Sequence, residues 1–143
     1  MPAEVFIDTN ILVYAHDRDA GQRHVRARKL VEAAWQAESW PHVSVQVLQE
    51  LFVNLLRKGV PVAEVRETVM DYAQWSVVPN TVALVEAAAG EMTRWSLSFW
   101  DALIVAAARS CRASVIWSED LADGQDYAGV RVVNPLAGPQ PKG

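Results

Sequence analysis

The 143-residue chain is long enough for one domain that buries roughly 70% of its unfolded surface, so it can fold without a disulfide or a structural metal. Its single cysteine, Cys111, excludes an intramolecular disulfide and is typical of a reducing compartment. The net charge of −4 argues against a protein that holds nucleic acid by its overall charge. No secretory leader is recognisable, and the longest apolar stretch, 96–108, is too short to span a bilayer, so we expect a soluble, cytoplasmic protein with no membrane partner.

Strand-like and helix-like segments alternate along the chain. Short apolar runs predict strands at 5–7, 42–45, 76–78, 114–117 and 130–133, and apolar periodicity predicts helices at 11–15, 20–37, 45–58, 62–75, 82–95 and 99–112. Three of these helices follow good N-caps, which are Ser44, Thr81 and Ser98. Buried strands separated by helices predict an α/β fold with a central parallel sheet and helices on both faces. We expect one domain over 1–134 and a flexible tail at 135–143, because the tail has three prolines and two glycines.

An acid directly follows the first predicted strand. Asp8 lies at the carboxyl end of strand 5–7, the edge of an open α/β sheet at which ligands bind. Asp8 could also serve only as the cap of the next helix, a role that Thr9 or Asn10 could fill equally well. Three further acids could reach the same edge, and they are Glu50, Asp101 and Asp120.

Glu50 belongs to a helix that is apolar almost all round. Only a narrow polar stripe interrupts the apolar surface, and it consists of Gln46, Glu50, Asn54 and Arg57. Such a stripe faces either solvent or a polar cleft, and periodicity alone does not choose between the two.

Asp101 is the only charged residue between Trp95 and Ala108. It follows Ser98 by three residues and so lies in the first turn of a helix, where the dipole favours an anion by about 0.3–1 kcal/mol, as in a capping box. A carboxylate that is desolvated among large apolar side chains costs several kcal/mol unless it is paired. We therefore expect a cation beside Asp101.

Asp120 follows the strand 114–117 and returns the chain to the edge that carries Asp8. Glu119 and Asp123 are close enough in sequence to substitute for Asp120 or to assist it, and all three could simply form an acidic loop. Two carboxylates about 4 Å apart repel by about 4 kcal/mol at an effective dielectric constant of about 20. No lysine follows a strand at this edge, so a divalent cation is the natural compensation, and oxygen ligands suit Mg²⁺ or Mn²⁺.

Four short stretches resemble the acidic motifs of PIN-domain ribonucleases, in the same order and over nearly the whole chain. They are 6–10, 49–51, 99–102 and 117–121, and the compact length is similar to that of VapC toxins. The resemblance implies a Mg²⁺- or Mn²⁺-dependent endoribonuclease that forms a homodimer and is inhibited by a small cognate antitoxin. Carried over by position, the family's acids are Asp8, Glu50, Asp101 and Asp120, and its polar supporting positions are Thr9, Asn10 and Ser118, with Asp123 as a further supporting acid.

In this interpretation Asp8 and Asp101 bind the principal metal. Glu50 and Asp120 complete its shell, hold a second ion or orient the attacking water. Hydrolysis by a metal-activated water leaves a 5′-phosphate and a 3′-hydroxyl and needs no histidine. Four arginines are candidates for holding the RNA backbone, namely Arg23, Arg26, Arg28 and Arg57.

Other interpretations are a PIN-domain nuclease that processes RNA without an antitoxin, and a PIN-like scaffold that binds RNA or protein without cutting. A response-regulator receiver has a similar size and an acidic Mg²⁺ pocket. It needs paired acids after its first strand and a lysine at a later strand end, and the sequence has neither.

Overall fold

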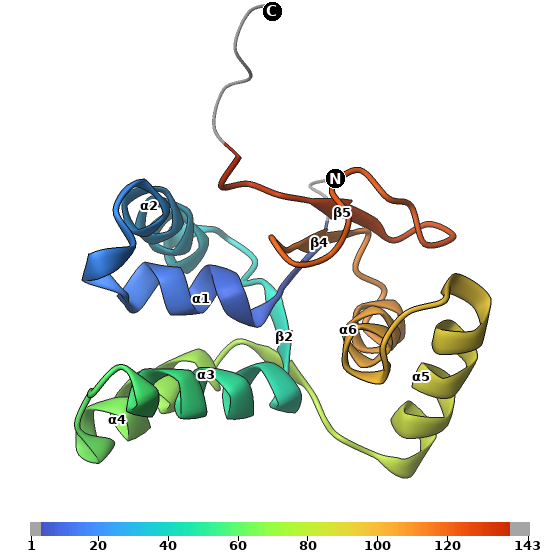
Figure 1. Ribbon diagram of the computed structural model, residues 1–143, viewed down its shortest axis with the longest axis horizontal. Coiled ribbons are helices and arrows are strands. Elements are labelled where there is room, and N and C mark those ends of the chain that lie inside the picture. The colour runs from blue at the N-terminus through green and yellow to red at the C-terminus, as the bar shows by residue number, and fades with distance from the viewer. Residues whose placement is uncertain (1–3, 138–143) are drawn as a thin grey trace, which may run out of the picture.

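The computed structural model describes residues 4–137, in which a central sheet is covered by helices (Figure 1). The strands are β1 (Val5–Ile7), β2 (His42–Ser44), β3 (Ser76–Val78), β4 (Val115–Trp117) and β5 (Arg131–Val133). The helices are α1 (Thr9–His16), α2 (Gln22–Gln36), α3 (Val45–Arg57), α4 (Val62–Tyr72), α5 (Val82–Trp95) and α6 (Phe99–Ser110), and a 3₁₀ turn, η1 (Arg18–Ala20), lies between α1 and α2. The predicted α/β class is confirmed.

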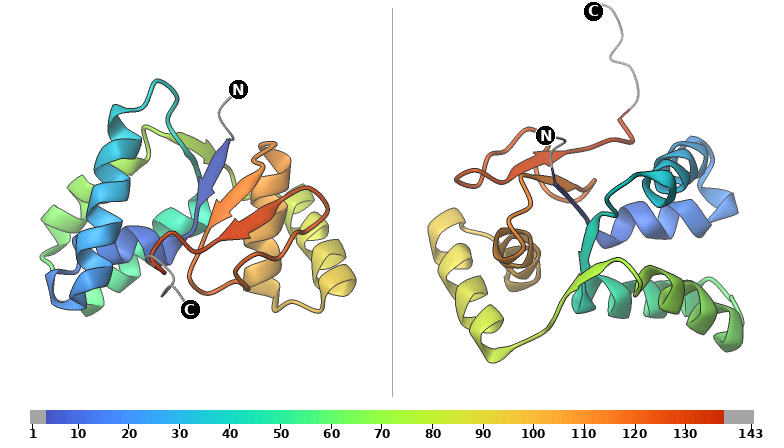
Figure 2. Two further views of the ribbon diagram at one scale, coloured as in Figure 1. Left: turned by 90° about the horizontal axis from the view of Figure 1, so that it is seen from above. Right: turned by 180° about the vertical axis from the view of Figure 1, so that it is seen from behind.

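The strands are all parallel and lie in the order β3-β2-β1-β4-β5. The chain moves outward from β1 to β2 and β3 and then returns to place β4 on the other side of β1. Seen from above, β1, β4 and β5 lie side by side (Figure 2). A reversal of this kind leaves a crevice at the carboxyl ends of the two strands that flank it, which is where open parallel sheets bind ligands. Here these strands are β1 and β4, whose last residues, Ile7 and Trp117, are in register.

The helices lie on both sides of the sheet, α1 to α4 on one side and α5 and α6 on the other (Figure 1). The change of side follows from the reversed strand order, because right-handed crossovers that run in opposite directions along a sheet cover opposite faces. The segment 102–108 of α6 is buried throughout, since the helix packs against α5 and against strands of the sheet. None of the helices within residues 4–137 is long and apolar enough to cross a membrane.

The observed helices differ from the predicted ones at their ends. The helix predicted at 20–37 is α2, which begins only at Gln22, because Gly21 adopts a φ of 63°, a conformation that glycine reaches without steric cost, and Ala20 belongs to η1. Helix α1 begins two residues earlier than predicted, since Asp8 caps it. The three predicted N-caps are confirmed, and they are Ser44, Thr81 and Ser98.

The last described residues are packed onto the domain. Leu136 is buried, its N–H donates to Asn134 Oδ1 (3.0 Å), and its carbonyl accepts from Arg26 Nη1 (3.0 Å). Packing therefore continues beyond residue 134, where composition placed the domain boundary. Of the predicted flexible tail, residues 138–143 lie outside the described residues.

Candidate active site

Asp8 lies where β1 becomes α1, at the crevice between β1 and β4. Its backbone N–H donates to the carbonyl of Trp117 (2.9 Å), which extends the contact between the two strands by one residue. One carboxylate oxygen caps α1 by accepting from the N–H of Thr9 (2.8 Å), and the other accepts from the hydroxyl of Ser118 (2.8 Å). Asp8 is therefore a helix cap, and it is also joined to the loop that follows the distant strand β4.

A cavity of about 350 Å³ lies beside Asp8, and all four predicted acids line it. We call it the acidic cavity. Asp8 reaches it from the end of β1, Glu50 from α3, Asp101 from the first turn of α6, and Asp120 from the loop after β4. The fold thus brings carboxylates from four distant parts of the sequence to the carboxyl edge of the sheet.

The polar stripe of α3 faces the acidic cavity. Its members there are spaced four residues apart, and they are Gln46, Glu50, Asn54 and Lys58. Periodicity also placed Arg57 in this stripe, but Arg57 is exposed and does not line the cavity. Lys58 lies about 40° further round the helix than Asn54, whereas Arg57 lies about 60° to the other side. Among residues 4–137, Lys58 is the only cationic side chain in the lining.

Thr9 and Glu50 are in direct contact. The Thr9 hydroxyl donates to Glu50 Oε1 (2.8 Å) and so ties the start of α1 to the middle of α3. Glu50 is half-buried. Of the two environments that periodicity left open for this residue, the structure shows the cleft.

Asp101 follows the N-cap Ser98, whose Oγ accepts from the backbone N–H of Asp101 (3.2 Å). Within residues 4–137 no donor forms a hydrogen bond with the Asp101 carboxylate. The expectation that this acid is deeply desolvated among large apolar groups is wrong, because Asp101 is half-buried and the neighbouring Trp100 is 62% exposed. The strongly desolvated acid is Asp8, which is 6% exposed.

Of the three acids that compete for the fourth position, only Asp120 lines the acidic cavity. Asn10 Nδ2 donates to Asp120 Oδ2 (3.0 Å) and lies 3.4 Å from Asp8 Oδ2. Glu119 instead accepts from Arg23 Nε (3.0 Å) and the Tyr14 hydroxyl (3.1 Å).

Asp123 is engaged away from the acidic cavity. Its Oδ1 accepts from the backbone N–H of Asn134 (2.9 Å), a contact between two loops. The structure therefore does not bring this predicted supporting acid to the other carboxylates.

The charge on Asp8 is opposed by its surroundings. Burial raises the pKa of Asp8 to about 6, although the hydrogen bonds from Ser118 and from the N–H of Thr9 act in the opposite direction. The negative charges of Asp120 and Glu50 raise it further. The site therefore favours either a proton or a cation at Asp8.

The residues of the acidic cavity fit a hydrated divalent cation better than an ion enclosed by protein. Among residues 4–137, no three His, Cys, Asp or Glu side chains stand close enough together to hold an ion. Mg²⁺ commonly takes only one or two carboxylates and keeps several waters. Gln46 adds a further indication, because its Oε1 is buried and has no hydrogen-bond partner in the described chain, so it can accept from a water molecule.

The four arginines that were predicted to hold RNA do not line the acidic cavity. Arg57 is exposed, as described above. Arg23 pairs with Glu119, and Arg28 pairs with Glu32 (3.0 Å). Arg26 donates to the carbonyl of Leu136. Glu119 and the Leu136 carbonyl reach their arginines through tertiary contacts, whereas Glu32 lies on the same helix as Arg28. The number of charges along the sequence does not reveal which arginines already have such a partner.

Comparisons with solved structures find the same fold in bacterial proteins. A chain of a toxin–antitoxin complex from Klebsiella pneumoniae has a TM-score of 0.66 and 21% identity, over 92% of this chain and 98% of that chain. VapC20 from Mycobacterium tuberculosis, described as a toxin that cleaves the sarcin-ricin loop, has a TM-score of 0.67 and 20% identity, over 82% of this chain and 90% of that one. FitAcB from Neisseria gonorrhoeae has a TM-score of 0.55 and 12% identity, over 93% and 99% of the two chains.

The comparison with curated protein sequences found no match. The family model of the PIN domain matches residues 5–122, a range that runs from β1 to the loop after β4 and contains all four acids of the cavity. The chain therefore belongs to the PIN domain family.

Proposed function

We propose that the chain is an endoribonuclease that depends on Mg²⁺ or Mn²⁺. The observation that supports this most is that Asp8, Glu50, Asp101 and Asp120 line one cavity. An uncharged Asn could cap α1 equally well, whereas the buried Asp8 is opposed by desolvation and by two acidic neighbours. A strongly perturbed carboxyl group in a cavity indicates a binding function rather than a stabilising one.

We assign Asp8 and Asp101 to the principal metal, directly or through water, and Glu50 and Asp120 to the rest of its shell, to a second ion or to the attacking water. When bound, a divalent ion would supply an activated water and stabilise charge on the phosphate. Hydrolysis then leaves a 5′-phosphate and a 3′-hydroxyl. Among the described residues, no histidine lines the cavity.

Polar groups of the chain hold these acids in place. Ser118 and the N–H of Thr9 bind Asp8, the Thr9 hydroxyl binds Glu50, and Asn10 binds Asp120. Three of the four acids, all but Asp101, therefore meet a substrate in a largely fixed arrangement, which lowers the cost of orientation during the reaction.

We further propose that the chain is the cytoplasmic toxin of a VapBC-type pair, with a small antitoxin as its partner and RNA as its substrate. Support comes from the toxin–antitoxin complex of Klebsiella pneumoniae and from VapC20, which share the fold over most of both chains. A short protein encoded beside this chain should co-purify with it, and its removal should release the nuclease activity. A monomer without such a partner would instead favour an RNA-processing enzyme.

We also propose a homodimer in which α5 contacts α5 of a second copy. Leu84 and Ala88 of α5 are buried, while a row of other apolar residues on the helix is exposed. This row is Val82, Val85 and Met92. An exposed apolar row of this kind on a helix is typical of an interface.

The test of the nuclease proposal is cleavage of structured RNA by the purified full chain. Cutting should require Mg²⁺, stop in EDTA, and be lost in Asp8→Asn and Asp101→Asn. Asp71→Asn, an exposed change on α4 outside the acidic cavity, should cut like the wild type. Metal-dependent binding or folding without any cutting would favour the scaffold interpretation and contradict the proposal.

A further inference from the structure

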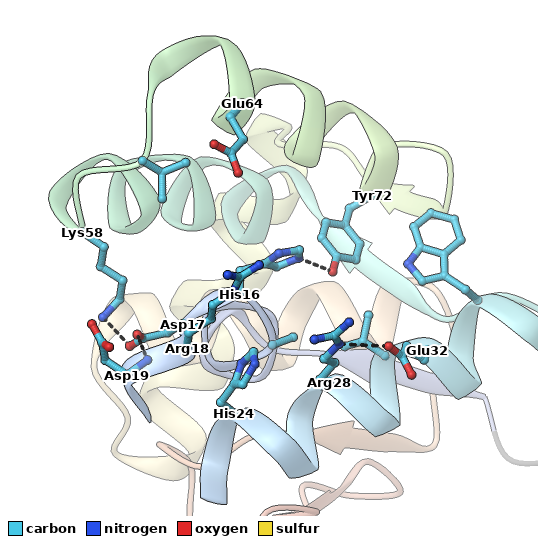
Figure 3. A pocket seen from close by; sticks show the side chains of 14 residues that line it. His16, Asp17, Arg18, Asp19, His24, Arg28, Glu32, Lys58, Glu64 and Tyr72 are labelled. Carbon is cyan, nitrogen blue, oxygen red and sulfur yellow. Dashed lines mark hydrogen bonds and ion pairs between the residues drawn. The ribbon is translucent and has the colours of Figure 1, made fainter. Parts of the chain in front are cut away.

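Lys58 lines two cavities. One is the acidic cavity, and the other is a larger cavity of about 810 Å³ lined by α1, α2, α4 and the segments next to them. In Figure 3, which shows the larger cavity, the Lys58 side chain extends from the end of α3 toward Asp17. Lys58 is therefore a residue that the two linings share.

The only partner of the Lys58 ammonium within the described chain is Asp17. Nζ lies 2.8 Å from Asp17 Oδ2, while the other oxygen of Asp17 accepts from the N–H of Asp19 (3.1 Å). The Lys58 side chain is 40% exposed and that of Asp17 is 16% exposed. Ion pairs with this much solvent contact contribute little to stability, so another anion can replace Asp17 at small cost.

The position of Lys58 relative to the acids decides which anion it can bind. Lys58 comes eight residues after Glu50 on the same stripe of α3, about 12 Å along the helix axis. Lys58 therefore lies at the end of the α3 part of the lining, beyond Glu50 and Asn54. An RNA chain whose cleaved phosphate binds at the acids can therefore present a neighbouring phosphate to Lys58.

We propose that Lys58 is a positioning residue that binds the RNA phosphate next to the cleaved one, with that phosphate replacing Asp17 as its partner. The inference rests on the proposed nuclease function and adds a contact to it. A lysine ammonium is a compact point charge that binds phosphate oxygens from several directions, which suits a backbone contact without sequence preference. It also supplies the positive charge that the four predicted arginines do not bring to the cavity.

The first test is RNA binding by the full chain in the Asp101→Asn background with Mg²⁺, in which nothing is cut. Adding Lys58→Gln should weaken binding about tenfold at low salt and reduce the slope of log affinity against log salt by about 0.7, the value for one lost phosphate contact on a single strand. Lys58→Arg should restore both values. Asp17→Asn should tighten binding, because it removes the competing anion.

The matched control is Lys29→Gln, which makes the same change at an exposed position on α2 outside both cavities. It should leave the salt slope unchanged. Arg57→Gln tests the neighbouring cation on the same helix. If Arg57→Gln lowers the slope and Lys58→Gln does not, the proposal is wrong. Thermal unfolding of each variant shows whether a loss of binding is a loss of fold.

The second test locates the phosphate. A neutral methylphosphonate is placed in turn at each position beside the cleavage site, and its effect is measured on wild-type and Lys58→Gln protein that can cut. The neutral group should raise KM for the wild type and not for the variant at one position only, with kcat nearly constant. If the methylphosphonate raises KM by the same factor in the wild type and in Lys58→Gln at every position, the proposal is wrong. If the wild type binds RNA but does not cut it, the nuclease proposal fails, while the Asp101→Asn binding test still decides the role of Lys58.

Discussion

Ser118 donates a hydrogen bond of 2.8 Å to Asp8, a residue 110 positions earlier in the chain. The same buried hydroxyl accepts from the N–H groups of Asp120 (3.1 Å) and Leu121 (3.2 Å). One side chain therefore orients the loop that carries the fourth acid and stabilises the charge on the first. This dual role makes Ser118 the supporting residue whose loss is easiest to detect.

Ser118→Ala is expected to raise the pKa of Asp8 above its value of about 6, because the hydrogen bond that favours the carboxylate is removed. Protons then compete better with the metal. The pH at which kcat/KM rises should therefore be higher in the variant than in the wild type. If the pKa of Asp8 increases by about one pH unit, activity below the new pKa should fall about tenfold. The measurement is a pH profile at subsaturating Mg²⁺. Ser114→Ala, an exposed change on the segment that leads into β4, should leave the profile unchanged.

Asp8→Asn is expected to stabilise the metal-free protein at alkaline pH. Burial raises the pKa of Asp8 from 3.8 to about 6, so the folded chain binds a proton more tightly than the unfolded chain. The stabilisation of the folded chain by this tighter proton binding is fully present below about pH 3.8 and is lost as the pH rises through about 6. Ionised Asp8 then costs up to about 3 kcal/mol of unfolding free energy, since a tenfold change in proton affinity corresponds to about 1.4 kcal/mol. Urea unfolding in EDTA should show that Asp8→Asn has a higher free energy of unfolding than the wild type near pH 8. Near pH 4 the two proteins should differ little.

The same variant tests metal binding without any measurement of activity. Mg²⁺ should raise the unfolding midpoint of the wild type near pH 8, because a ligand that binds only the folded state stabilises it. The midpoint of Asp8→Asn should respond much less. An equal response of both proteins would show that the ion binds away from Asp8.

The identity of the fourth acid is tested by three single changes. Asp120→Asn should lower kcat by about 10- to 100-fold, because Asp120 lines the acidic cavity. Glu119→Gln and Asp123→Asn should each retain most of the activity, since Arg23 and the Asn134 N–H hold these acids outside it. Single-turnover cleavage separates these effects on the chemical step from effects on product release.

Val85→Glu is expected to convert the proposed dimer into a monomer. Val85 is 49% exposed on α5, so the new carboxylate stays hydrated in the monomer but is buried when two copies meet. Sedimentation at several concentrations measures the change, and Glu67→Gln on α4 serves as an exposed control. A wild-type chain that is monomeric at all concentrations would contradict the dimer.

Local signals in the sequence were sufficient to predict much of the fold. Short apolar runs gave the five strands, and the hydroxyl caps Ser44, Thr81 and Ser98 gave the starts of three helices, because caps act on the adjacent turn. Asp8 and Asp120 could be placed at one edge because parallel strands present their carboxyl ends together.

Features that depend on distant contacts were not predictable. The sequence showed an isolated acid at Asp101 but not that Trp100 turns outward, which leaves that acid half-buried. Periodicity found the polar stripe of α3 and chose Arg57 over Lys58, because only the tertiary packing fixes which side of the stripe meets the cavity. The four-residue spacing from Gln46 to Lys58 was the signal that could have corrected it.

The pairing of β1 with β4 also determines when the acidic cavity can first form. Asp8 is synthesised well before its partners in this pairing, and Ser118 follows it by 110 residues. A nascent chain can build β1 to β3 with their helices while the crevice still lacks its second wall. Since domains complete their folding as units during synthesis, the four carboxylates assemble only after the segment that carries Trp117 and Ser118 has been synthesised.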